Sequence, residues 1–427
     1  MITRWERSVP VHDVPIWTRP FKVLVAIGAL ALGFTLWREL AGLGPATGLN
    51  DAYAWGIWKT FNVMVLTGLG SGGFSIGIAA WLFRREKLHV VMRTALLTSF
   101  LAYLSGLTLL AVDVGRPWNM YWLLMPWKWN FHSPLLEVAF CMPMYALLPL
   151  LLENVPPVLE RVHATKPQYR ELVEKAEKIM VRFYPYVVGL AYVLPAMHQS
   201  SLGALMLLGG HKVHALWQTP MLPLLYVWAA AFMGFSCVAG TLLFCTLVWN
   251  RKFDIEVLTE MNRITAWLIG SWMLVRMVDL IARGHFLTSL SLDIFAGLFW
   301  TEMLFLGVAL FMLLDSSKHY DAKLMFYAHT VAAVGGMLYR FNPTTLAFQP
   351  RPGAFYFPSV IELLISIGYV SIAVVAFAYL AKVLAILPAT NRDWFEMERA
   401  QKDRELQGSK APAVGTPDYA TGNSFTD

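Results

Sequence analysis

The sequence is poor in charge and in cysteine. Only 15% of its 427 residues are Asp, Glu, Lys or Arg, whereas globular domains carry about 25%. Its three cysteines, Cys141, Cys237 and Cys245, lie singly in apolar runs, and no CxxC pair occurs. We therefore expect no iron–sulfur cluster and no cysteine-rich zinc site in this chain. A phosphate-binding loop is also missing, since no Lys-Ser/Thr pair follows the glycines at 68–73.

Hydrophobic residues are abundant instead, at 57% of the chain, which excludes an ordinary soluble or disordered protein. About ten runs are long and apolar enough to cross a hydrocarbon layer of about 30 Å as helices. No period-two alternation accompanies them, as a transmembrane barrel would require. The sequence thus predicts an all-α polytopic membrane protein with spans near 21–41, 56–83, 92–112, 135–152, 183–208, 220–248, 262–282, 293–314, 323–339 and 359–387.

The ends of the chain are polar and divide it into three parts. We predict an N-terminal segment (1–20), a transmembrane domain (21–387) and a tail (388–427) with a composition typical of disorder. Most of the 34 Lys and Arg residues fall in the loops on the side of the two ends. This distribution predicts that both termini are cytoplasmic. It also explains the net charge of +6 without any binding of nucleic acid.

The loops on the other side are long and rich in aromatic and turn residues, at 113–132, 209–218 and 342–358. Functional residues concentrate on loops that a rigid scaffold holds. We therefore expect the chemistry, and any soluble partner, on this face. For single Trp and Tyr residues the alternative is an interfacial aromatic belt.

A few charged residues fall inside or at the ends of the spans, where insertion of a charge costs about 2.5–3.5 kcal/mol. Arg276 and Asp279 share one helical face, as a structural ion pair or as part of a proton path. Asp113 and Arg116 have the same spacing and predict an interfacial pair or a polar wall around a ligand headgroup. Further candidates for proton handling are the isolated carboxylates Glu302 and Glu362.

The most polar patch within an apolar span is Leu194-Pro-Ala-Met-His198-Gln-Ser-Ser. His198 titrates near neutrality and is a candidate haem ligand, quinone partner or satisfied core group. Glu137 follows Ser133-Pro134, a favourable helix start, so it serves either the helix terminus or the chemistry beside the Trp-rich loop.

Three function classes fit these features: a quinone-reactive electron-transfer subunit, a b-type cytochrome and a secondary transporter. A dihaem cytochrome needs about four His ligands on facing helices. Only His198 and His329 lie within spans, so at most one bis-His haem could form. A transporter is hinted at only by Pro195 and by the glycines of the second span.

Several segments taken together resemble the NrfD/PsrC superfamily of membrane subunits, over roughly residues 20–390. The resemblance is strongest to the members that serve uptake nickel–iron hydrogenases. The matching segments are Asp113-Val-Gly-Arg116-x-Trp118-Asn119, Leu194-Pro-x-Met-His198-Gln-Ser-Ser-x-Gly203, Lys212-Val-His214-x-Leu-Trp217-Gln218, Phe232-Met-Gly-Phe-Ser236 and Tyr356-Phe-Pro-x-x-x-Glu362.

The resemblance implies ten helices around two four-helix bundles, in a bacterial inner membrane protein without haem or iron–sulfur cluster of its own. It implies a menaquinone or ubiquinone site near the outer face. A periplasmic iron–sulfur subunit beside a catalytic subunit, a hydrogenase or another reductase, would exchange electrons with that site. Proton translocation is proposed for such proteins.

The motifs also imply residue roles. His198 and Tyr103 would hydrogen-bond the quinone oxygens, and Glu137 would exchange the accompanying protons. The remaining residues would form the quinone-binding wall (Asp113, Arg116, Trp118 and Ser200) and a proton path (Arg276, Asp279, Glu302 and Glu362).

Overall fold

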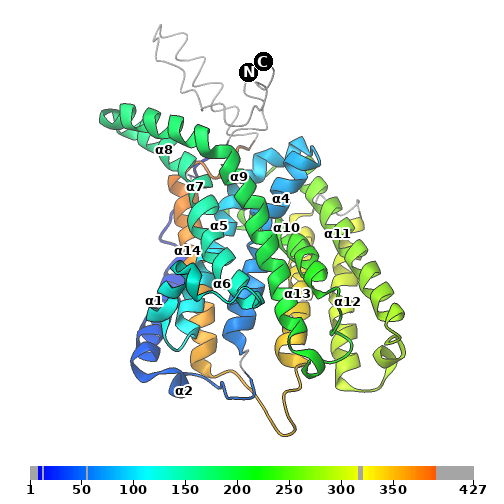
Figure 1. The fold of residues 1–427 in the computed structure, drawn as a ribbon. Coiled ribbons are helices and arrows are strands. Elements are labelled where there is room, and N and C mark those ends of the chain that lie inside the picture. Colours follow the sequence, from blue (N-terminus) through cyan, green and yellow to red (C-terminus); the bar gives the residue numbers. More distant parts are fainter. Residues whose placement is uncertain (1–7, 12–13, 54–55, 316–320, 391–427) are drawn as a thin grey trace.

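A computed structural model describes residues 8–11, 14–53, 56–315 and 321–390 of the chain (Figure 1). The predicted tail at 388–427 and the N-terminal segment at 1–20 therefore lie in large part outside the described residues. In chain order the elements are β1 (Ser8–Val9), α1 (Arg19–Ala41), α2 (Leu43–Ala46), η1 (Trp58–Val65), α3 (Leu66–Leu69), α4 (Gly72–Gly77), η2 (Ile78–Leu82), η3 (Glu86–Val91), α5 (Met92–Asp113), η4 (Pro117–Leu124), η5 (Pro126–Lys128), α6 (Pro134–Tyr145), η6 (Ala146–Leu150), α7 (Leu151–Glu153), α8 (Val155–Thr165), η7 (Pro167–Tyr169), α9 (Arg170–Leu207), η8 (Gly210–Lys212), α10 (Leu222–Trp249), α11 (Ile255–Ala282), η9 (Leu287–Leu290), α12 (Ile294–Leu314), α13 (Ala322–Phe341), η11 (Asn342–Leu346), α14 (Val360–Val383) and β2 (Leu387–Pro388).

The prediction of an all-α polytopic membrane protein is confirmed. Within the described part of the chain, nine helices are long and apolar enough to cross a membrane. The predicted ninth span, 323–339, forms α13, which packs between α10 and α12 but is not among those nine. It is more polar because it carries His329 and Arg340, both of which it buries completely inside the bundle.

The long helices form two groups of four. The segment Trp58–Leu82, α5, α6 and α9 pack together, and α10, α11, α12 and α13 form the second group. Helix α10 joins the groups, since it contacts α9 as well as α3 and α4. Helices α1 and α14 pair with each other, and α14 lies against α5 (Figure 1). This arrangement agrees with the implied pair of four-helix bundles.

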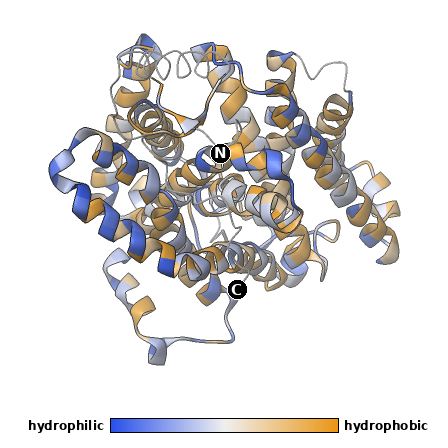
Figure 2. Cartoon of the chain, turned by 90° about the horizontal axis from the view of Figure 1, so that it is seen from above, coloured by the Kyte–Doolittle hydropathy of each residue, from blue (hydrophilic) through white to orange (hydrophobic). Residues whose placement is uncertain are grey.

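The outer faces of the bundle are apolar, as a helix facing lipid requires. Large side chains such as Leu40, Trp267 and Phe311 are mostly exposed. Figure 2 shows hydrophobic residues along most of the helices, with hydrophilic residues gathered on the arm at the left. This arm consists of α8 and the first part of α9 and projects beyond the bundle in Figure 1. It lies between the predicted fourth and fifth spans.

The two ends of the described chain meet on one side of the bundle. Strand β1 pairs antiparallel with β2, with Ser8 opposite Pro388 and Val9 opposite Leu387. We call this side the terminal face. The opposite side, the loop face, carries residues 114–133, 208–221, 283–293 and 342–359. There the backbone of Val213 pairs with that of Phe348, which joins two of these loops.

The second span approaches α10 without intervening side chains. Its helix is interrupted at residues 70–71, between α3 and α4. A Cβ added to Gly234 would lie 2.6 Å from the backbone of Ser71 and Gly72, and a Cβ on Gly72 would lie 3.1 Å from the Gly234 carbonyl oxygen. Gly72 and Gly234 therefore permit this close helix packing.

Replacement of Gly234 by valine should destabilise the protein, because backbone atoms of the second span cannot move aside as a side chain would. We expect a loss of about 1–3 kcal/mol or more, seen as a lower midpoint of thermal unfolding of the purified protein in detergent. Gly240→Val on the same helix is the matched control, since a Cβ there meets nothing within 4 Å. Equal losses for the two variants would contradict this account of the contact.

Candidate functional site

The structure brings together two of the residues that the motifs assign to the quinone. His198 of α9 is fully buried, and its ring centroid lies 5.8 Å from that of Tyr103 on α5. Tyr103 is also buried and meets the ring of Tyr145 edge-on, at 4.7 Å. Within the described residues, neither ring nitrogen of His198 has a side-chain hydrogen-bond partner, and the backbone of Val138 is the polar group that lies against the ring. A buried imidazole in this state has its hydrogen-bonding capacity available for a ligand or water.

A second set of polar residues holds this pair, and the sequence motifs did not reveal it. Arg340 of α13 donates through Nη2 to Gln199 Oε1 at 2.9 Å and to the Tyr226 carbonyl at 2.7 Å. Gln199 Nε2 in turn donates to Thr67 Oγ1 at 3.0 Å and lies 3.5 Å from the Tyr103 hydroxyl. The sequence alone places Arg340 just beyond the predicted span 323–339, whereas the structure places it in the last turn of α13.

Glu137 reaches the neighbouring helix instead of capping its own. Ser133 precedes α6 as its N-cap residue but makes no side-chain capping bond. The Ser201 hydroxyl of α9 donates to Glu137 Oε2. Glu137 itself is exposed at the edge of the bundle, while the backbone of the next residue in sequence lies against His198. The predicted Ser200 is turned away, since its hydroxyl bonds the Met197 carbonyl at 2.9 Å.

Asp113 lies at the end of α5 and is buried, with 3% of its surface exposed. Its ion-pair partner is Lys59 of the second span, with 3.7 Å between Nζ and Oδ2. Arg116 and Trp118 are exposed, and α5 ends at Asp113. The spacing of three residues therefore no longer places Arg116 on the face of Asp113, and the interfacial pair that the spacing suggested is not formed.

Glu362 lies near Asp113 on the loop face, at the start of α14. It is the third residue of α14 and forms a capping box with Ser359. Its carboxylate accepts hydrogen bonds from the Gly48 amide at 3.1 Å, the Ser359 amide at 2.6 Å and the Tyr356 hydroxyl at 3.0 Å. It thus ties the loop at 342–359 to the segment after α2.

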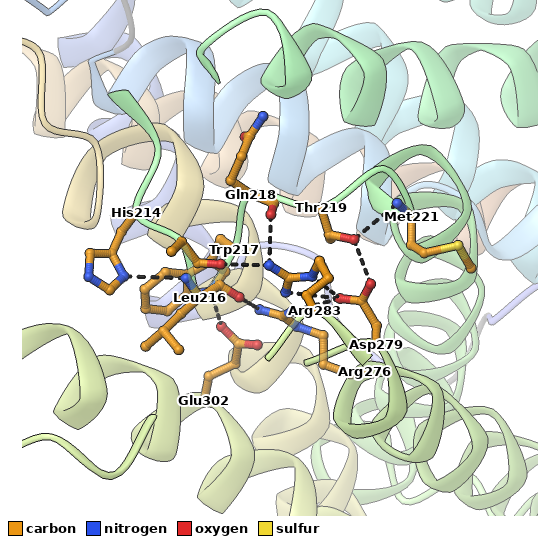
Figure 3. A network of polar contacts seen from close by, with 11 residues as sticks. His214, Leu216, Trp217, Gln218, Thr219, Met221, Arg276, Asp279, Arg283 and Glu302 are labelled. Carbon is orange, nitrogen blue, oxygen red and sulfur yellow. Dashed lines mark hydrogen bonds and ion pairs between the residues drawn. The ribbon is translucent and has the colours of Figure 1, made fainter. Parts of the chain in front are cut away.

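The other three residues of the predicted proton path lie together under the loop at 208–221 (Figure 3). Asp279 accepts a hydrogen bond from Thr219 at 2.7 Å and from Arg283 Nε at 3.1 Å. Arg276 lies 3.7 Å from Asp279 and donates to the Leu216 carbonyl at 2.5 Å. The predicted Arg276–Asp279 pair is present, and it also holds a loop.

Glu302 of α12 completes this network from the other side. It is fully buried, and its Oε2 accepts from Trp217 Nε1 at 2.9 Å and from Asn342 Nδ2 at 2.6 Å. Arg283 donates to the carbonyls of Ala215 and Gln218. Residues 215–219 are therefore fixed by charged groups of α11 and α12, as Figure 3 shows.

A haem does not fit the two histidines within the spans. The Nε2 of His329 is 2.8 Å from Asn262 Oδ1, and His198 packs against Tyr103 on the other group of helices. Among the described residues, no three His, Cys, Asp or Glu side chains form a group that could hold a metal ion.

A polytopic helical membrane protein with a buried polar site beneath its loop face is the class that this fold and site define. The chain belongs to the polysulphide reductase NrfD family, whose model matches residues 46–342. The predicted family resemblance is thereby confirmed.

The relatives of this chain are membrane subunits and reductase subunits. It is 31% identical over 390 residues to the probable Ni/Fe-hydrogenase 2 b-type cytochrome subunit of Escherichia coli K12, covering 91% of this chain and 97% of that protein. It is 27% identical to the menaquinone reductase integral membrane subunit of Nitratidesulfovibrio vulgaris, covering 83% and 88%. A selenate reductase subunit of Mesobacillus selenatarsenatis matches over 102 residues only, 24% of this chain and 23% of that protein, at 26% identity.

The order of the loop at 208–221 should depend on pH through His214. Burial lowers the pKa of His214; its ring stacks on Phe295 at 4.4 Å, and its Nδ1 accepts from the Leu216 amide at 3.4 Å. A lowered pKa means that the folded loop favours the neutral ring, so its stability is complete above the ordinary value of about 6.5 and falls below it. After correction for the intrinsic exchange rate, which itself falls with pH, the hydrogen-exchange protection of peptide 209–221 should decrease between pH 7.5 and 5, and less so in His214→Gln. Exchange with the same pH response in both proteins would contradict this assignment.

A reduced-minus-oxidised absorbance spectrum of the purified chain should show no haem α-band, because its two intramembrane histidines are not arranged as an axial pair. An α-band whose intensity corresponds to one haem per chain, and which disappears in His198→Ala or His329→Ala, would show that the chain is a cytochrome.

Proposed function

We propose that this chain is the quinone-reactive membrane subunit of a multisubunit respiratory oxidoreductase. It would exchange electrons between an iron–sulfur protein docked on the loop face and the quinone pool of the membrane. The observation that carries this proposal is the buried His198, whose ring nitrogens have no side-chain partner in the described structure and which lies beside Tyr103. A quinone carbonyl is an acceptor that both side chains can bind through their donor groups.

Reduction of a quinone consumes two electrons and two protons, and the chain supplies groups for the protons. Tyr103 is oriented by Gln199, which Arg340 fixes in turn. Glu137 is exposed at the edge of the bundle and bonded to Ser201, one turn of α9 from His198. A carboxylate in this place can take protons from the loop side and pass them to the quinone oxygens as general acid. Asp113, which pairs with Lys59, would form part of the wall.

The relatives support the substrate and the partners. One is a menaquinone reductase subunit and another a hydrogenase subunit, so menaquinone or ubiquinone, and a hydrogenase or another reductase, are the candidates for this chain. The exposed aromatic side chains of the loop face, Trp118, Trp122 and Trp127, offer a docking surface for a soluble subunit. The Lys and Arg distribution supports a periplasmic loop face and cytoplasmic termini in a bacterial inner membrane protein.

Proton translocation would also require a continuous polar route across the membrane, because moving one charge against 100 mV costs about 2.3 kcal/mol. Arg276, Asp279 and Glu302 would form the part of this route on the loop side of the second bundle. Glu362, which forms the capping box of α14, would take up or release protons on the α14 side.

His198→Ala and Glu137→Gln should each lower quinone-dependent turnover of the assembled complex by about 100-fold, the scale of a lost acid–base group. Assembly, measured by co-purification of the partner subunits, should be unchanged. Thr108→Val, on the exposed side of α5, is the control and should retain activity. Full turnover in either site variant would remove that residue from the mechanism.

A further inference from the structure

A cavity lies on the terminal side of the first group of helices. Its volume is about 340 Å³, and its walls come from α4, α5, the end of the fourth span, and α9 between residues 179 and 192. Neither His198 nor Glu137 lines it. Tyr145 does, and the ring of Tyr145 touches Tyr103 of the first site.

The wall of this cavity contains a carboxylate that the proposed function does not use. Glu153 lines the cavity, and its Oε2 is buried and has no hydrogen-bond partner in the described chain. Two phenol side chains, Tyr184 and Tyr192, line the same space. A buried carboxylate oxygen without a donor is costly, so a ligand that brings a hydroxyl donor to Glu153 would relieve this cost.

The surroundings of the cavity indicate that such a ligand comes from the bilayer. Trp81, Ile179 and Phe183 line the cavity and are also exposed on the outer surface of membrane-spanning helices. The cationic residue of the wall, Arg93, is already paired, with 2.5 Å between its Nη2 and Glu160 Oε1.

These features distinguish between two candidate ligands from the bilayer, a phospholipid and a hydroquinone. A phospholipid has most of its volume in acyl chains, which bring no donor to Glu153, and its headgroup is charged. A hydroquinone carries two hydroxyl groups on a flat ring, and its apolar tail can remain in the lipid. Pockets of this size and composition, apolar with a few polar groups, are typical of small-molecule sites.

We propose that this cavity is a second binding site for a membrane hydroquinone, distinct from the site at His198. One ring hydroxyl donates to Glu153, and the other side of the ring lies among Tyr184 and Tyr192. The site binds without redox chemistry of its own, and Tyr145 forms a direct contact from it to Tyr103. The choice of a hydroquinone rests on the proposed function.

The test is photolabelling of the complete complex in lipid nanodiscs with a short-chain azido-naphthoquinol, followed by peptide mapping. We expect label on peptides from 145–157 and 179–192. Glu153→Gln should reduce that label about tenfold, the effect of losing one hydrogen bond to a charged group. Label near His198 should not change. Glu171→Gln, an exposed carboxylate on the arm, is the matched control.

Tyr192→Phe serves as a second variant, because it keeps the ring and removes only the hydroxyl. The proposal is overturned if the wild-type cavity takes no label, if neither variant lowers the label, or if a co-purified phospholipid fills the cavity and excess probe does not displace it. The readout at His198 is separate. Label in the cavity without label near His198 would contradict the proposed function but support the cavity as a binding site. Label near His198 without label in the cavity would support the proposed function and contradict the cavity site.

Discussion

The buried guanidinium of Arg340 is the constraint on which the centre of this protein depends. A buried cation needs acceptors. The chain provides the Tyr226 carbonyl and the Gln199 amide oxygen to Nη2 and the face of the Tyr226 ring at 4.0 Å, while Nε and Nη1 have no hydrogen-bond partner in the described chain. These contacts join α13, α10 and α9. Because Gln199 is held from one side by Arg340, its amide nitrogen can orient Thr67 and Tyr103 on the other.

A similar principle organises the loop face. Arg276 and Asp279 of α11, and Arg283 just after it, bind backbone and side chains of the loop at 208–221. Glu362 does the same for the segment after α2. Intramembrane charges of this protein thus position irregular backbone at the membrane surface. That is how a docking surface can remain rigid above a buried site, and it is compatible with a second use in proton transfer.

The helical fold and nearly all span positions can be predicted from the sequence, because apolar length is a local property. The partners of the polar residues cannot be predicted in the same way. Asp113 meets Lys59 instead of Arg116 because α5 ends at residue 113, and Ser201 rather than Ser200 faces Glu137 because of the rotation of α9. Arg340 falls just outside the predicted span because α13 is too polar for a typical span, although that polarity is buried.

The central claim is that a quinone ring lies against His198 and Tyr103. The most direct test is a cryo-electron microscopy map of the complete complex with a bound naphthoquinone-site inhibitor. The account predicts ring density within hydrogen-bond distance of His198, reached from the lipid between α5, α6 and α9. Inhibitor density at another place, with the space around His198 closed by side chains, would contradict it.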